Sequence, residues 1–186
     1  MKNRPYFLDH KKNVVVTGGA GLIGSHLCER LLLEANVICV DDLSHSSIHN
    51  IDHLLQYSNF EFIRHDVNDP MPLEEFEELD RFRVKYLGIQ EIYHLACPTS
   101  PKYFEELKLH SLAANSKAMI ATLDLAVRYK AKYLFSSSSV VYGQPTLGHH
   151  VFAEGDEGNV DHLSPRASYT EGKRFAETCI ETYRQV

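Results

Sequence analysis

The chain has 186 residues, of which 44% are apolar, and it carries 25 acidic against 19 basic residues. This composition excludes a disordered chain and fits one globular domain. A net charge of −6 without a long basic run argues against a nucleic-acid partner and against a membrane-binding patch. No apolar stretch reaches the ~18 residues of a membrane span, and the first residues lack the apolar segment of a signal peptide.

Short apolar runs predict strands, and the longer stretches of helical periodicity between them predict helices. In chain order we expect strands at 14–16, 37–40, 60–63, 92–96 and 133–135, and helices at 22–33, 73–86, 103–129 and from about 166 onward. This alternation predicts a Rossmann-type doubly wound parallel α/β sheet of about five strands. Residues 1–12 are predicted to be an N-terminal extension, and residues 13–186 one domain that ends in the last helix.

Three glycines follow the first predicted strand, at Gly18, Gly21 and Gly24. Between a strand and a helix, this spacing is typical of a loop that binds the pyrophosphate of a dinucleotide. The N–H groups and positive dipole end of the helix that follows would meet the anion. Asp41 ends the second strand 23 residues after Gly18, near the ~20-residue offset of a carboxylate on the adenosine ribose. An acid there repels a 2′-phosphate, so we predict NAD rather than NADP; the alternative for Asp41-Asp42 is a solvated strand end.

Tyr169 and Lys173 are one turn apart on the last predicted helix and share a face. An ammonium held near a phenol lowers the tyrosine pKa from its usual value of ~10, which makes Tyr169 a candidate general base. Four serines, 136–139, follow the fifth strand at its carboxyl end, where ligands bind in open α/β sheets. A chance surface pair and a serine-rich loop are the alternatives.

The four cysteines are scattered along the chain, without the spacing of a zinc site or a redox motif. They are Cys28, Cys39, Cys97 and Cys179. We expect free thiols in a reducing compartment and predict a cytoplasmic location. The adjacent His149 and His150 have no further ligand at metal-binding spacing, so no metal site is predicted.

Four stretches together resemble the extended short-chain dehydrogenase/reductase (NAD-dependent epimerase/dehydratase) family. They are TGGAGLIGSHL at 17–27, HDV at 65–67, YHLACPTSP at 93–101 and SPRASYTEGKR at 164–174. The last three are most similar to the UDP-glucuronate decarboxylase (UDP-xylose synthase) branch. In that branch NAD oxidises the C4 hydroxyl of a UDP-sugar, the β-keto acid loses carbon dioxide, and C4 is reduced again.

The resemblance implies a role for individual residues. Tyr169 would be the proton acceptor, Lys173 would hold the nicotinamide ribose, and Ser138 would fill the Ser/Thr position of the family. The residues implied to contact NAD are Gly18, Gly21, Leu22, Ile23, Gly24, Asp41, Asp42, Asp66, Val67, Leu95, Cys97, Tyr169 and Lys173. The family also implies a UDP-sugar substrate and a homodimer through the long helix and the Tyr169 helix. A stripe from Phe175 to Tyr183 could serve that contact or the core.

Three residues at two sites depart from the decarboxylase pattern. Val140 stands where the decarboxylases carry a glutamate that assists the carboxylate chemistry, and Ala113-Ala114 stand where they carry Lys-Thr. The chain is also much shorter than the members of this family. Three hypotheses follow. The first is a decarboxylase-like enzyme, and the second is a UDP-sugar 4-epimerase or 4,6-dehydratase, of which Val140 favours the epimerase. The third is a non-catalytic NAD-binding fragment or homologue.

Overall fold

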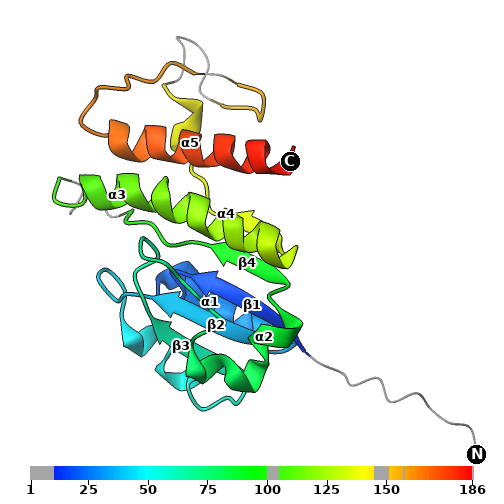
Figure 1. Ribbon diagram of the computed structural model, residues 1–186. Coiled ribbons are helices and arrows are strands. Elements are labelled where there is room, and N and C mark those ends of the chain that lie inside the picture. The colour runs from blue at the N-terminus through cyan, green and yellow to red at the C-terminus, as the bar shows by residue number, and fades with distance from the viewer. Residues whose placement is uncertain (1–10, 100–104, 145–150, 157, 186) are drawn as a thin grey trace, which may run out of the picture.

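The computed structural model describes residues 11–99, 105–144, 151–156 and 158–185. Five parallel strands form one sheet in the order β3-β2-β1-β4-β5 (Figure 1). The strands are β1 (Lys12–Thr17), β2 (Ala35–Asp41), β3 (Phe60–Arg64), β4 (Glu91–His94) and β5 (Lys132–Phe135). The predicted Rossmann-type parallel sheet is therefore confirmed.

The central strand β1 is apolar over its valine run because both of its faces are covered. Val14 and Val16 pack in a cluster with α1 (Leu22–Leu31) and with two short 3-10 turns, η1 (Ile48–Asn50) and η2 (Asp52–Leu54). Val15 points to the opposite face, into a cluster that includes residues of α4 (Lys117–Tyr129). Successive side chains of a strand alternate between its faces, so the valine run belongs to both layers of the core.

The last helix, α5 (Ala167–Arg184), packs beside α3 (Lys108–Ala114) and α4 (Figure 1). Ala176 and Cys179 join Met119 and Leu123 of α4 in a third, smaller core cluster. Most of the apolar stripe noted in the sequence therefore serves the core, while Phe175 remains 45% exposed.

The acidic helix expected over 73–86 is wrong. The structure has a 3-10 helix, η3 (Glu77–Phe82), and a single helical turn, α2 (Val84–Leu87). Arg83 separates them in the left-handed conformation, with φ 54°. Phe82 and Val84 are both buried. A continuous helix would place two such residues about 200° apart around its axis, so the break lets both reach the core.

The single long helix expected over 103–129 is also wrong; its first two residues lie outside the described ones. It is divided into α3 and α4 at Asn115 and Ser116. The Asn115 side chain donates to the Ser111 carbonyl at 2.8 Å and to the Cys97 sulfur at 3.1 Å. This link to the loop after β4 is a tertiary contact that helical periodicity does not reveal.

Smaller differences occur at two strand ends. β4 stops at His94, two residues earlier than expected. After β5, residues Ser139–Tyr142 form a 3-10 turn, η5, which the sequence analysis did not predict. All four cysteines are free, as predicted. Within the described residues, no helix is long and apolar enough to cross a bilayer.

Candidate functional site

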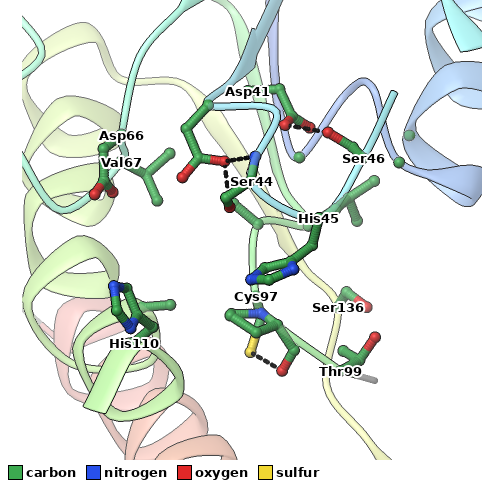
Figure 2. A pocket seen from close by; sticks show the side chains of 18 of the residues that line it. Asp41, Ser44, His45, Ser46, Asp66, Val67, Cys97, Thr99, His110 and Ser136 are labelled. Atoms are coloured by element: carbon green, nitrogen blue, oxygen red, sulfur yellow. Dashed lines mark hydrogen bonds between the residues drawn. The ribbon is translucent and has the colours of Figure 1, made fainter. Parts of the chain in front are cut away.

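A pocket of about 540 Å³ opens along the carboxyl ends of the parallel strands. Figure 2 shows Asp41 and Ser46 at one end of it and Cys97, Thr99 and Ser136 at the other. The volume falls within the range of cofactor sites in proteins. Apart from Tyr169 and Lys173, every residue implied to contact NAD lines this pocket.

The glycine loop forms one wall of the pocket and requires its glycines. Gly18 has φ +69°, and a Cβ built on it would lie 2.8 Å from the Ala96 backbone nitrogen. A Cβ on Gly24 would overlap the carbonyl oxygen of Gly18. Helix α1 therefore begins close against the loop. Its first turn has no side-chain cap and no acidic residue, so its unpaired N–H groups are available to an anion.

The two aspartates at the end of β2, Asp41 and Asp42, differ in how many of their hydrogen-bond acceptor sites the protein already uses. Asp41 is buried, and its carboxylate accepts hydrogen bonds from the Ala20 N–H at 3.0 Å, the Leu43 N–H at 2.9 Å and the Ser46 hydroxyl at 2.6 Å. A carboxylate has about four acceptor sites, so roughly one remains on Asp41. Asp42 is half-buried, and within the described part of the chain only its Oδ1 accepts, from the backbone and the hydroxyl of Ser44.

Two pairs of pocket residues lie farther along the strand ends. Asp66 Oδ1 accepts from the Asn68 backbone and side chain, which fixes the turn after β3, and Val67 beside it is buried. Leu95 and Cys97 follow β4 and are half-buried. Burial raises the pKa of the Cys97 thiol, although the charge of Lys173 and the bond from Asn115 oppose that rise. Cys97 is therefore a neutral pocket group at pH 7.

Lys173 is the most deeply buried charged side chain of the α5 region, at 2% exposure. Its Nζ donates to the Ser136 carbonyl at 2.7 Å and lies 4.4 Å from the centroid of the Phe135 ring. The same atom is 5.8 Å from the centre of the Tyr169 ring. Burial lowers the pKa of Lys173, opposed by the nearby Cys97 and Glu177. The structure thus brings Tyr169 and Lys173 together, beside a backbone carbonyl next to the pocket.

Of the four serines, Ser136 lines the pocket, and Ser138 does not. Ser138 is the N-cap of η5, where its hydroxyl accepts from the Val140 N–H at 3.5 Å. Tyr169, Lys173 and Ser138 all lie outside the pocket lining, so their implied catalytic roles remain predictions.

Several lining residues were not expected from the sequence. They include Ser44, His45, Ser46, His65, Asn68, Ala96, Pro98, Thr99, Leu107, His110 and Ala114. Position shortly after a strand could have indicated Ser44 to Ser46, whereas nothing in the pattern pointed to His110. Among the described residues, no group of three or more His, Cys, Asp or Glu side chains could hold a metal ion.

Comparison with known proteins gives a consistent picture. A family profile described as GDP-mannose 4,6 dehydratase matches residues 15–186. UDP-glucuronic acid decarboxylase 4 of Arabidopsis thaliana is 40% identical over 173 residues, which cover 92% of this chain and 35% of that protein. The chain spans 35–50% of the length of the curated relatives that it matches.

Two solved structures show the same fold. UDP-N-acetylglucosamine 4-epimerase from Methanobrevibacter ruminantium M1 superposes with a TM-score of 0.74 at 27% identity, over 94% of this chain and 51% of that one. A UDP-glucose 4-epimerase from Thermus thermophilus, in complex with NAD, gives a TM-score of 0.69 at 25% identity, over 93% and 51% of the two chains.

Proposed function

The chain belongs to the NAD-dependent epimerase/dehydratase family, and from this premise we propose that it binds NAD in its strand-end pocket and modifies a UDP-sugar. The family match extends over residues 15–186, which confirms the resemblance predicted from the motifs. The cofactor and the sugar-nucleotide substrate are proposals for this chain, because it spans only part of each relative.

One observation carries the proposal: an uncapped helix N-terminus and an acidic strand end face the same pocket. The first turn of α1 suits the pyrophosphate. Oδ2 of Asp42 and the remaining acceptor site of Asp41 suit the ribose hydroxyls. Two carboxylates at this end disfavour a 2′-phosphate, which supports NAD over NADP. Asp66 and Val67 would border the adenine.

The chemistry that NAD supplies when bound is hydride acceptance from the sugar C4 and its return. Tyr169 would take the proton of the C4 hydroxyl, and Ser138 would hold that oxygen by a hydrogen bond. Lys173 would hold the nicotinamide ribose and favour the deprotonated tyrosine by its charge. The contact between Lys173 and Ser136 supports this arrangement because it fixes the ammonium beside the pocket.

Two outcomes for the sugar are proposed in order. The curated relatives favour decarboxylation of UDP-glucuronate, with loss of carbon dioxide after C4 oxidation. Val140 favours 4-epimerisation instead, because an apolar side chain on η5 cannot ionise or hydrogen-bond to a carboxylate. Binding of NAD without turnover is a separate alternative, supported by Val140 and Ala113-Ala114 at positions where the decarboxylases carry a glutamate and Lys-Thr.

The test is calorimetry with NAD, NADH and NADPH, followed by incubation with UDP-glucuronate and UDP-glucose. Loss of carbon dioxide, read as a product mass, supports decarboxylation, and a product of unchanged mass supports epimerisation. Tyr169→Phe removes the proposed proton acceptor and should abolish product while NADH binding persists. No heat with NAD or NADH in folded protein would contradict the proposal.

We further propose a homodimer through α3, α4 and α5. These helices leave apolar side chains in solvent, at 40–79% exposure: Leu109, Leu112, Ile120 and Phe175. Light scattering at several concentrations tests this proposal, because Phe175→Glu should shift a dimer to a monomer. A monomeric wild-type protein at high concentration would contradict it.

A cytoplasmic location is also proposed, supported by four free thiols. A fluorescent fusion that accumulates in an oxidising compartment would contradict it.

A further inference from the structure

His94 occupies the middle position in a row of three strand ends. In the parallel register it pairs with Thr17, the last residue of β1, and with Phe135, the last residue of β5. Its side chain is buried, at 1% exposure. It does not line the strand-end pocket, so it cannot act by touching a ligand there. It lies between the glycine loop and the surroundings of Lys173.

On one side His94 is linked to the glycine loop. Its Nδ1 lies 2.8 Å from the Thr17 hydroxyl, which also accepts the Ala96 N–H at 3.4 Å. Thr17 leads directly into Gly18, and the α-carbon of Gly18 packs against the backbone of Leu95 and Ala96. The position of the end of β4 relative to β1 therefore fixes the first turn of the loop.

On the other side His94 is linked to Lys173 through Phe135. The imidazole and the Phe135 ring are stacked, with centroids 6.0 Å apart and an interplanar angle of 21°. Lys173 Nζ lies 4.4 Å from the centroid of that phenyl ring and donates to the carbonyl of the next residue, Ser136. One histidine thus contacts both the residue that leads into the loop and the ring beneath the lysine.

The imidazole is neutral at physiological pH. Burial, and then the charge of Lys173, lowers the pKa of His94 to about 4, while the backbone carbonyl of Ala114 opposes this effect. That carbonyl favours a hydrogen on Nε2, which leaves Nδ1 to accept from the Thr17 hydroxyl. Within the described residues Nε2 makes no hydrogen bond of full geometry, so the Ala114 carbonyl acts on it as a nearby acceptor.

We propose that His94 is a positioning residue that holds the glycine loop and Lys173 in register, so that one dinucleotide meets both. This inference rests on the proposed function, in which the loop takes the pyrophosphate and Lys173 the nicotinamide ribose. Both contacts are made to one molecule of fixed length. A shift of the order of 1 Å between them therefore weakens binding of the whole dinucleotide, and binding of its adenosine half stays intact.

The experiment compares NADH with AMP, which has only the adenosine half, on the same variants by calorimetry. His94→Phe keeps the stacked ring and removes both nitrogens, and Thr17→Val removes the same link from the other side. Each should weaken NADH about tenfold and leave AMP within twofold. Thr17→Ser keeps the hydroxyl and should bind both ligands as the wild type does. The double variant, Thr17→Val with His94→Phe, should be no weaker than either single variant, because both remove one link.

Three results would overturn the inference. The first is unchanged NADH affinity in Thr17→Val, which also decides the matter if His94→Phe does not fold. The second is an equal loss for AMP and NADH accompanied by a lower melting temperature, which is the signature of a structural role. The third is additive losses in the double variant. A wild-type protein that binds neither ligand overturns the proposed function and this inference with it, whereas failure of this inference alone leaves wild-type binding intact.

Discussion

The first two strands in the chain, β1 and β2, are much more deeply buried than the last strand, β5. In β1, five of six residues are buried, and in β2, six of seven. In β5 none of the four residues is buried, and Leu134 is 50% exposed. The glycine loop and the aspartates follow the buried strands, whereas Ser138 follows β5, and Lys173 is bonded to its end. The glycine loop and the aspartates thus rest on the buried core, whereas Ser138 and the hydrogen bond of Lys173 lie at the end of a more lightly covered strand.

The largest expected effect comes from adding a methyl group at the tight contact between α1 and the glycine loop. In Gly24→Ala the added methyl group would overlap the backbone of Gly18, which cannot move without displacing β1. We expect a loss of about 5 kcal/mol in the free energy of unfolding and more than 100-fold weaker NADH binding. Urea unfolding and calorimetry measure the two effects.

Gly21→Ala is the matched control, because a Cβ there meets only the Gly18 carbonyl, at 3.2 Å. Its stability should change by less than about 1 kcal/mol. If Gly24→Ala and Gly21→Ala lower the free energy of unfolding equally, the close packing of α1 against the loop is not the reason that glycine is required there.

The difference in burial between β2 and β5 predicts that truncation of a side chain to alanine lowers the free energy of unfolding more on β2 than on β5. Ile38→Ala on β2 removes a fully buried side chain and should cost about 4 kcal/mol. Leu134→Ala on β5 should cost less than about 1 kcal/mol, because half of that side chain is already in water. Urea unfolding measures both. Equal losses would show that something covers β5 in solution.

Acidification should affect the junction between the two regions. The pKa of His94 is lowered from 6.5 to about 4, so the folded state resists a proton that the unfolded chain accepts. Stability is therefore complete above pH 6.5 and falls as the pH drops toward 4, by about 3 kcal/mol. His94→Phe should flatten this part of the pH profile in urea unfolding. A variant with the wild-type slope would assign the loss to other groups.

The elements that sequence predicted well are those decided by local pattern. A valine run, three spaced glycines and an acidic strand end are sufficient to place β1, α1 and β2, because each follows from burial or backbone geometry over a few residues. The two helix breaks could not be predicted, because they depend on distant partners. Arg83 turns so that its neighbours reach the core, and Asn115 bonds to Cys97, which is 18 residues earlier.

The same limit applies to the site. Position after a strand predicted the pocket at the strand ends, but it could not distinguish Ser136 from Ser138, because the turn of η5 decides which serine faces inward. The sequence also contained no indication of a role for His94, because its contacts come from three neighbouring strands that are far apart in the chain.

The smallest expected effect distinguishes the charge of the aspartates at the end of β2 from their contribution to stability. Asp42→Asn keeps the side-chain oxygen that accepts from Ser44 and removes the negative charge. We expect unfolding unchanged within about 0.5 kcal/mol, NADH affinity lowered about threefold, and the preference for NADH over NADPH reduced about tenfold, or about 1.4 kcal/mol. Asp41→Asn is the contrast, because an amide cannot accept all three hydrogen bonds of that buried carboxylate; it should destabilise the fold by about 1–3 kcal/mol. Calorimetry with both cofactors tests the pair. If Asp42→Asn leaves the preference unchanged and Asp41→Asn abolishes it without loss of stability, the more buried aspartate is the one that reads the ribose.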